Sequence, residues 1–336
     1  MKTKNKFNSG YYFLKASLLK KRTPLNVSFS VTNKCNLHCT YCGIYKRKQN
    51  ELTKEQIFSL IDELSEMGTQ RLGFWGGEPL IRNDIGELIN YANKKGIYTT
   101  VISNGYLVPQ KIDELKNLEL LFLSLDGSEK CHDLSKGKGS YKKVIKAIET
   151  AINNNIPVWT ITVINKNNLN DVDFVINLAK KMGFFATFQV LYRDSEITEN
   201  NSDILPTKEE NKAVINKLIE EKRNGAPIGS SEAYLKHILN WNDYNKTALF
   251  NQESKFKMKC FGGKFFCNID TDGNVYTCDW MIGKVNTLNC VRDGFRKAWD
   301  NISIPKCNGC LKSCYSEYNL MFSFNWNAIM NALKLL

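Results

Sequence analysis

Long apolar runs are missing from this sequence, and no stretch approaches the about 18 uninterrupted apolar residues that would span a bilayer. We therefore expect no transmembrane segment. The N-terminus has lysines but no apolar segment followed by a small-residue cleavage site, so we expect no export signal and a cytoplasmic location. The 336 residues include 43% apolar and 24% charged residues, which predicts one large globular domain with a smaller one beside it.

Acidic residues are absent from residues 1–50, although this segment holds eleven Lys and Arg and the whole chain has a net charge of +12. Three hypotheses fit such a segment: a solvated surface, contact with anionic lipid, and contact with nucleic acid. Apolar residues interleave with the basic ones between residues 7 and 22, which favours a short amphipathic surface helix. We interpret residues 1–25 as a basic aromatic arm.

Cysteine is abundant, with eleven residues of which most fall into two groups. Closely spaced cysteines in the cytosol are more often metal ligands than disulfides, because the compartment keeps thiols reduced. The first group, Cys35, Cys39 and Cys42, lies within eight residues. Three thiolates from one loop can hold three irons of a cubane cluster and leave the fourth iron open for chemistry. A zinc site is the alternative.

Strand and helix patterns alternate from residue 26 onward. This alternation predicts a parallel sheet with right-handed crossovers, and ligands at the carboxyl ends of its strands. Six strands are too few for a closed eight-stranded barrel, so we predict an α/β fold with a partial (β/α)6 barrel over residues 26–192. The expected strands are 26–31, 71–75, 98–102, 119–125, 157–164 and 185–191, and the expected helices are 53–67, 84–95, 109–116, 141–154 and 169–182.

Three further segments follow the predicted barrel. Residues 193–254 form a helical linker region, with a polar loop at 194–204 and a charged helix that begins at Thr207. Residues 255–318 are rich in Gly and Cys and are expected to form a small extension. Residues 319–336 are apolar and predict a C-terminal helix, which either packs on the core or rests on a membrane.

The Cys-x3-Cys-x2-Cys spacing, with Tyr41 before the last cysteine, resembles the signature of the radical SAM superfamily. The resemblance implies a 4Fe-4S cluster on Cys35, Cys39 and Cys42, with the amino and carboxylate groups of S-adenosylmethionine on the open iron. An electron from the cluster would then cleave the sulfonium bond to give methionine and a 5'-deoxyadenosyl radical. An electron donor such as ferredoxin or flavodoxin is implied as well, while the protein supplies orientation and excludes solvent.

Strand-end motifs extend this resemblance. Gly76-Gly77-Glu78-Pro79 follows the second strand and resembles the superfamily motif for the methionine amino group. Similar enzymes contact S-adenosylmethionine from the ends of the third and fourth strands, where this chain has Ser103-Asn104 and Ser124-Leu125-Asp126. By resemblance, Ser124 is assigned to the ribose or carboxylate, and Ser103 and Asn104 to the pocket wall. The expected cofactor-binding residues are Tyr41, Gly76, Gly77, Glu78, Pro79, Ser103, Asn104, Ser124, Asp126 and Lys136.

Lys136 departs from the family pattern. Related enzymes have an Arg four residues after the His of a His-Asp pair, and that Arg pairs with the methionine carboxylate, whereas this chain has His132-Asp133 followed by Lys136. A lysine supplies the positive charge but not the two-pronged hydrogen bond of a guanidinium. Cys131 is interpreted as a small buried hydrophobic residue.

The second cysteine group resembles the twitch or SPASM extensions of radical SAM enzymes, whose thiolates hold an auxiliary iron-sulfur cluster. A hairpin around Asp272-Gly273-Asn274 is expected to bring Cys260 and Cys278 close to the later Cys-x2-Cys-x3-Cys run. One auxiliary 4Fe-4S cluster is expected, and a zinc ribbon is the alternative. The expected ligands are Cys260, Cys278, Cys307 and Cys310, with Cys314 as a substitute or fifth ligand.

Two substrate classes remain open for such an enzyme. Relatives with SPASM-like domains often mature ribosomally made peptides, which favours a peptide. The basic arm and the apolar C-terminus favour instead a peripheral membrane contact and a lipid or isoprenoid substrate. A different class of protein, one that binds nucleic acid through zinc knuckles, would leave the strand-end motifs unexplained, so no nucleic-acid partner is expected. No catalytic side chain is assigned.

Overall fold

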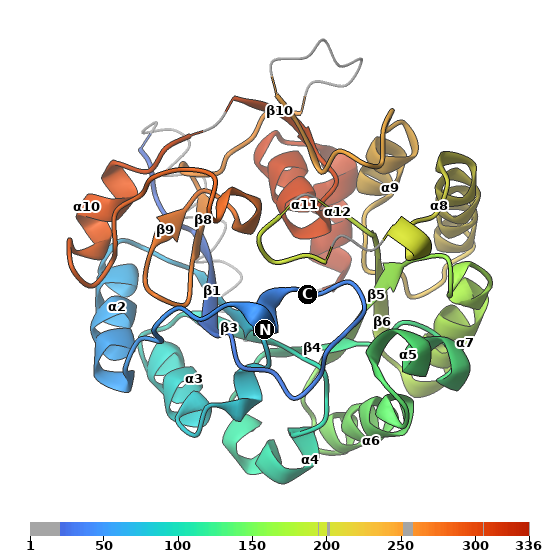
Figure 1. Cartoon of the computed structure of the whole chain (residues 1–336), viewed down its shortest axis with the longest axis horizontal. Helices are drawn as coiled ribbons and strands as arrows, with labels where there is room; N and C mark the ends of the chain where they lie inside the picture. Colours follow the sequence, from blue (N-terminus) through green and yellow to red (C-terminus); the bar gives the residue numbers. More distant parts are fainter. Residues whose placement is uncertain (1–20, 194, 200–201, 251–257, 305, 336) are drawn as a thin grey trace.

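The structure, a computed structural model, describes residues 21–193, 195–199, 202–250, 258–304 and 306–335 (Figure 1). The amphipathic helix expected between residues 7 and 22 falls almost entirely outside these ranges. The main sheet has eight strands in the order β6-β5-β4-β3-β2-β1-β8-β9. Its strands are β1 (Asn26–Thr32), β2 (Arg71–Gly76), β3 (Tyr98–Ser103), β4 (Leu120–Ser124), β5 (Val158–Ile164), β6 (Phe185–Val190), β8 (Phe266–Ile269) and β9 (Val275–Tyr276).

Helices surround the outside of this curved sheet (Figure 1). The prediction of a partial barrel of parallel strands is confirmed, because β1 to β6 pair in parallel with their neighbours in sequence order. The helices are α2 (Lys54–Glu66), α3 (Ile85–Lys94), α4 (Val108–Lys111), α5 (Glu129–Lys136), α6 (Ser140–Asn153), α7 (Val172–Met182), α8 (Lys208–Arg223), α9 (Glu232–Leu239), α10 (Phe295–Asp300), α11 (Ser313–Phe322) and α12 (Trp326–Leu335).

Sequence signals explain where several helices begin. Thr53 caps α2 with its side chain, and Gln56 returns a bond to the backbone of Thr53, which satisfies two N–H groups at the helix start. The same capping box begins α8, with Thr207 and Glu210. The apolar residues of α2 recur at helical spacing and are buried against the sheet: Ile57, Leu60, Ile61 and Leu64.

Two helices differ from the sequence prediction. The helix expected at 109–116 is a short α4 followed by a 3-10 turn at Ile112–Leu115. Helix α5, at Glu129–Lys136, was not predicted, because its apolar residues have no helical spacing and Leu134 is 55% exposed. It forms because Ser128 starts it in extended backbone and Gly137, with a φ of 107°, ends it.

The sheet continues into the Cys-rich segment, which is therefore not a separate layer. β8 pairs in parallel with β1, from Asn26 opposite Phe266 to Phe29 opposite Ile269. β9 then pairs antiparallel to β8, as the hairpin around Asp272-Gly273-Asn274 predicts. A separate two-stranded sheet joins β7 (Ala248–Phe250) to β10 (Cys307–Cys310).

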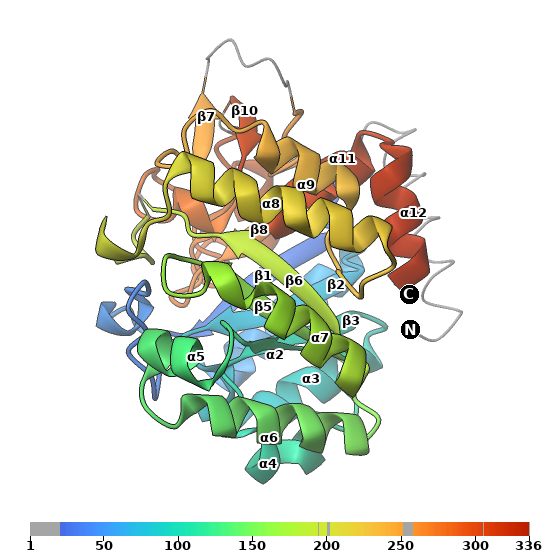
Figure 2. The same ribbon diagram turned by 90° about the vertical axis from the view of Figure 1, so that its right-hand side faces the viewer.

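Helix α11 lies between β6 and β8 and fills the gap that an open barrel leaves. Ser313, at its start, donates to the side chain of Gln189 in β6, and Tyr315 stacks on Phe266 in β8 with ring centroids 5.2 Å apart. The single C-terminal helix expected at 319–336 is instead α11 and α12, separated at Phe324, whose φ is 59°. Figure 2 shows α12 beside α9, which it contacts.

The two faces of the sheet differ in burial. Residues that point toward the outer helices are fully buried, as Leu72, Phe74, Val101, Leu121 and Leu123 show. Their neighbours along the strands point to the concave face and are only partly buried, as in β2, β5 and β6. The concave face is therefore accessible to solvent, and the carboxyl ends of β1 to β4 border it.

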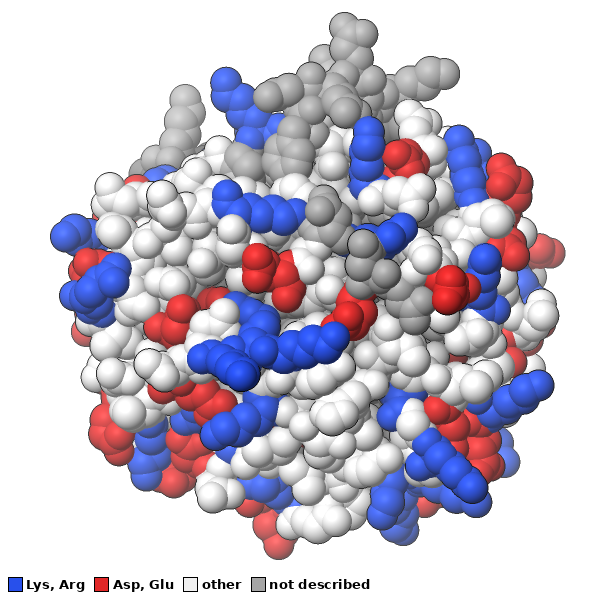
Figure 3. Space-filling view, viewed as in Figure 1, with Lys and Arg blue, Asp and Glu red and all other residues white. Residues whose placement is uncertain are grey.

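Charge is mixed over the surface. Basic and acidic side chains are interspersed on the face in Figure 3. In the described ranges, no helix has the length and apolar character needed to cross a membrane.

Candidate active site

The first cysteine loop follows β1 and is fixed from two sides. The amide of Thr40 donates to the carbonyl of Ser135 at 3.0 Å, which ties the loop to α5. On the other side, the backbone of Cys42 forms an isolated antiparallel β-bridge with Thr198, and the amide of Gly43 donates to the carbonyl of Ile197. Residues 195–199, predicted as part of a linker loop, thus form one wall of the cysteine loop.

The three thiols of this loop lie within electrostatic reach of one another. Burial, with smaller contributions from the neighbouring thiols of Cys39 and Cys35, raises the pKa of Cys42 to about 11. Burial also raises the pKa of Cys35, whose sulfur accepts a hydrogen bond from the amide of Leu37 at 3.4 Å. Donors of this kind stabilise thiolates bound to iron. A three-thiolate donor set in one half-buried loop fits a cluster with one open iron.

The glycines after β2 pack directly on the backbone that leads into the cysteine loop. A Cβ on Gly76 would lie 2.2 Å from the carbonyl oxygen of Thr32, and one on Gly77 would lie 2.2 Å from that of Lys34. Gly76 also has a φ of 140°, which other residues rarely adopt. These two positions require glycine, and the amide of Gly77 donates to Thr32 at 2.7 Å.

Glu78 connects the ends of β2 and β3 from a fully buried position. Its carboxylate accepts hydrogen bonds from the Ser103 hydroxyl at 2.9 Å and from the Asn104 amide at 2.7 Å. Burial raises the pKa of Glu78 to about 7, while these donors act to lower it. Pro79 is buried at the start of a 3-10 turn. The structure thus places Glu78 and Ser103 against each other, and Asn104 extends toward Cys35, with Nδ2 4.0 Å from its sulfur.

A buried lysine lies on the other side of the cysteine loop. Lys136 Nζ donates to the Tyr41 hydroxyl at 2.6 Å, lies 3.4 Å from the Asp126 carboxylate, and is 4.0 Å from the Cys39 sulfur. Tyr41 in turn donates to Asp126 at 2.7 Å. Burial acts to lower the pKa of Lys136, but Asp126, Cys39 and Tyr41 raise it well above its usual value. Three predicted residues thus form one hydrogen-bonded group. Ser124 is half-buried at the end of β4.

The second cysteine group assembles from three separate segments. Burial is the main cause that raises the pKa of the Cys278 and Cys310 thiols. Neighbouring thiols raise these pKa values as well: those of Cys260 and Cys307 act on Cys278, and those of Cys278 and Cys260 act on Cys310. Burial raises the pKa of Cys307 to about 12. Amides donate to the sulfurs of Cys260 and Cys310, each at 3.4 Å. The four residues that the sequence indicates as ligands therefore lie near one another.

Cys314 shares charged neighbours with one of these four. Burial does most to raise the pKa of its thiol, and Asp279 and Lys312 act on the pKa of both Cys314 and Cys278, although the Cys314 side chain is exposed. Cys267 and Cys290 are both buried. In the described part of the chain, no three His, Cys, Asp or Glu side chains are arranged to hold a single metal ion.

A second buried lysine, which sequence reasoning missed, lies beside these cysteines. Lys312 forms an ion pair with Asp279 at 2.5 Å, and its ammonium lies 3.9 Å from the centre of the Tyr192 ring. Asp279 directly follows Cys278 in sequence, and Lys312 lies two residues after Cys310. The sequence signal for this buried pair was the lysine inside the Cys-x2-Cys-x3-Cys run. If these cysteines are buried ligands, a charge between them needs an ion-pair partner.

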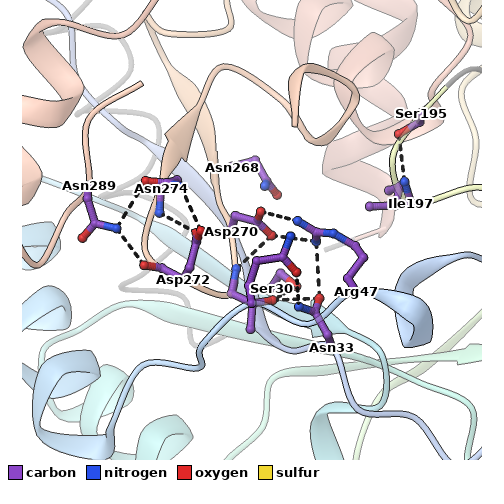
Figure 4. Close-up of polar contacts among 12 residues, drawn as sticks. Ser30, Asn33, Arg47, Ser195, Ile197, Asn268, Asp270, Asp272, Asn274 and Asn289 are labelled. Atoms are coloured by element: carbon purple, nitrogen blue, oxygen red, sulfur yellow. Dashed lines mark hydrogen bonds and ion pairs between the residues drawn. The ribbon is translucent and has the colours of Figure 1, made fainter. Parts of the chain in front are cut away.

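A polar network joins the two cysteine regions (Figure 4). Arg47, five residues after Cys42, makes a two-pronged ion pair with Asp270 at 2.9 and 2.5 Å, and the two side chains are only 6% and 2% exposed. Asn33, before the first cysteine, accepts from both Arg47 and Thr271. The loop of the first group is therefore held to the hairpin that leads to Cys278, and sequence reasoning missed this connection.

Comparison with known proteins identifies the family. A model of the Radical SAM superfamily matches residues 29–179, which include the cysteine loop and all the strand-end motifs. GTP 3',8-cyclase of Clostridium botulinum is 33% identical over 226 residues, which cover 58% of this chain and 70% of that protein. The chain belongs to the radical SAM superfamily. Radical SAM enzymes use a 4Fe-4S cluster and S-adenosylmethionine. Membership of this superfamily therefore argues against the alternative of a protein that binds nucleic acid through zinc knuckles.

Other similarities extend beyond the radical SAM core. Mycofactocin maturase MftC of Mycolicibacterium smegmatis is 26% identical over 306 residues, which cover 87% of this chain and 75% of that protein. Among solved structures, anSMEcpe with bound AdoMet and Kp18Cys peptide has a TM-score of 0.67 at 18% identity, and the match covers 92% of this chain and 99% of that one. At this identity the likeness shows the fold, and it includes the Cys-rich segment.

Proposed function

We propose that this radical SAM enzyme modifies a peptide, with one cluster on Cys35, Cys39 and Cys42 and an auxiliary cluster on Cys260, Cys278, Cys307 and Cys310. The observation that carries the proposal is the pair of cysteine groups held together by the Arg47–Asp270 ion pair. The first cluster, when bound, supplies the electron that cleaves S-adenosylmethionine. The proposal of a peptide substrate is supported by the similar structure of anSMEcpe, which contains a bound peptide.

The residues around the first loop would bind and orient S-adenosylmethionine. Glu78 fixes the turn after β2 against β3, so that backbone carbonyls of the Gly76-Gly77 turn can accept hydrogen bonds from the methionine ammonium. Asn104 and Ser124 offer amide and hydroxyl groups at neighbouring strand ends. The Lys136 ammonium supplies positive charge for the methionine carboxylate, and Asp126 and Tyr41 hold it in place.

The auxiliary ligands would form a closed set. Four thiolates satisfy every iron of a cubane, so such a cluster serves electron transfer rather than substrate binding. Burial of these thiols would keep water away from the cluster. Cys314 is the substitute ligand if one of the four is replaced.

Anaerobic reconstitution tests the proposal. The loaded protein, incubated with S-adenosylmethionine and dithionite, should form 5'-deoxyadenosine, and iron analysis should give about eight irons per chain, the content of two cubanes. Replacing Cys260 and Cys278 by Ala together should halve the iron and leave the cleavage of S-adenosylmethionine intact. About four irons in the unaltered protein would rule out the auxiliary cluster, and no cleavage after loading would rule out the enzyme activity.

A lipid substrate is the second candidate, supported by one surface. Trp326, Met330 and Leu333 are 74%, 47% and 58% exposed and recur on one face of α12. Large apolar side chains on one helix face can rest in the membrane interface. Replacing all three by Ser should abolish binding to anionic liposomes, whereas replacing the exposed Val291 and Ile304 by Ser should not. Equal binding of both variants would remove this candidate.

A further inference from the structure

Arg71 begins β2 and points to the concave face of the sheet. In this strand Leu72 and Phe74 are fully buried toward the outer helices, so the alternate residues Arg71, Gly73 and Trp75 face the other way. Arg71 pairs in register with Tyr98 of β3, at the end of the strands opposite to the cysteine loop. The arginine therefore lies on the same accessible face as the proposed S-adenosylmethionine site, but at its far end.

Two aromatic rings hold the guanidinium in place. Its central carbon lies 5.8 Å from the ring centre of Tyr98 and 5.9 Å from that of Phe122. Such contacts stabilise a cation without neutralising it, and the in-plane N–H donors stay available. Arg47 and Arg82, by contrast, each pair with an aspartate. Arg71 has no ion pair with a carboxylate in the described part of the chain.

The concave face of the sheet extends from Arg71 to α11. Ser313, at the start of this helix, donates to Gln189, whose partly buried side chain points to the concave face from β6. Cys314, the next residue of the helix, is exposed to solvent. Arg71 and the start of α11 thus border one accessible space on the concave side of the sheet.

We propose that Arg71 is a substrate-binding residue that recognises an anionic oxygen group, a carboxylate or a phosphate, at the end of this space distant from S-adenosylmethionine. This inference rests on the proposed function. Five residues along β2 separate Arg71 from Gly76, which corresponds to roughly 16 Å. For a peptide this span equals about five extended residues. The substrate therefore carries its acidic group about five residues from the position where hydrogen is abstracted.

The choice of Arg supports an anion rather than any polar group. A guanidinium presents paired N–H donors that match the two oxygens of a carboxylate or phosphate, and it stays charged at every physiological pH. The rings of Tyr98 and Phe122 already contact the guanidinium before a ligand arrives. A fixed donor loses less conformational freedom on binding, so the site gains affinity and specificity.

Affinity selection with defined probes tests this site. The loaded enzyme with S-adenosylmethionine would be mixed with a pool of random octapeptides, half with free and half with amidated C-termini, and in a separate arm with GTP. Retained ligands are identified by mass spectrometry. Peptides with Asp, Glu or a free C-terminus should be enriched, and Arg71→Gln should reduce this enrichment roughly tenfold or more. Arg71→Lys should retain part of it.

The control removes the same charge elsewhere. Arg292 is exposed and forms an ion pair with its neighbour Asp293, so Arg292→Gln should enrich the same peptides as the unaltered enzyme. Retention of GTP that depends on Arg71 would also support the anion site and would assign its ligand to phosphate. No preference for anions in the unaltered enzyme, or the same preference in Arg71→Gln, would overturn the inference. Formation of 5'-deoxyadenosine by the unaltered enzyme and by Arg292→Gln tests the proposed function separately, because its absence in both would remove the enzyme activity whatever the result at Arg71.

Discussion

The two cysteine regions share one arrangement and differ in how they are built. Each has a buried lysine paired with an aspartate and set against a tyrosine: Lys136 with Asp126 and Tyr41, and Lys312 with Asp279 and Tyr192. The first region takes its three thiols from one half-buried loop, whereas the second takes four from three segments. The difference matches an open iron that must meet a small molecule and a closed cluster that must only pass electrons.

Replacing single cysteines should give the largest difference in 5'-deoxyadenosine formation between variants of the two regions. Replacing Cys39 by Ala should abolish formation of 5'-deoxyadenosine, because two thiolates from one loop do not hold the cluster. Replacing Cys310 by Ala should leave at least part of it, and Cys314 is positioned to substitute. Product analysis by chromatography decides between these outcomes. Equal and complete loss in both variants would show that the two regions act as one unit.

The buried lysines offer the next largest effect. Replacing Lys312 by Met leaves the Asp279 carboxylate, whose Oδ1 has no hydrogen-bond partner among the described residues, without its ion pair. We expect a loss of about 3–5 kcal/mol in the free energy of unfolding. Replacing Lys136 by Met should cost less, since Asp126 keeps the Tyr41 hydroxyl and the amide of Val163 as donors.

Urea unfolding of the cluster-free protein measures both changes. Lys217 forms an exposed pair with Asp173, so Lys217→Met is the control and should change the free energy of unfolding by less than about 1 kcal/mol. A larger loss for Lys136→Met than for Lys312→Met would contradict this comparison of the two aspartates.

The two regions should contribute differently to the pH dependence of stability, because each contains a histidine. His132, in the first region, accepts from the amide of Asp126, and burial with the nearby Lys136 lowers its pKa to about 4. The unfolded chain takes up a proton below about pH 6.5, before the folded one does, so stability is present above that pH and falls as pH drops toward 4. At pH 5 this loss amounts to about 2 kcal/mol.

Melting curves between pH 7.5 and 5 check this dependence. His132→Leu should flatten it, although the variant starts from a lower melting temperature because the amide of Asp126 loses its acceptor. His237, beside the second group, also has a pKa lowered by burial, but its bond to the Cys310 carbonyl acts in the opposite direction. His237→Leu should therefore flatten the curve less. An unchanged slope in His132→Leu would show that the pKa of this histidine is not lowered in the folded state.

Local patterns in the sequence were enough for much of the fold and the first site. Strand-helix alternation predicted six parallel strands because each element carries its own hydrophobic period. The strand-end motifs could be placed in one site because parallel strands end at one edge. Glu78 and Ser103 were both expected near the cofactor, and the hydrogen bond between them follows because a buried acid needs donors.

Other features depend on contacts that no local pattern reveals. β8 has four residues, and its pairing with β1 joins positions 240 apart in sequence, from Asn26 to Phe266. Residues 195–199 are polar and give no signal of their pairing beside Cys42. From the sequence alone, Lys312 would be taken for a surface residue. Its charge is buried only because the folded chain brings its partner Asp279 near.

The pairing of β8 with β1 has a consequence for synthesis on the ribosome. Translation delivers β1 first, and β2 can cover one of its edges soon afterwards, but the other edge stays open until residues 266–269 emerge. An open strand edge is a template for aggregation, and contacts this distant in sequence form slowly. The nascent chain therefore completes its sheet only after most of it has been made, so mutations that slow this last closure should lower the yield of soluble protein before they affect catalysis.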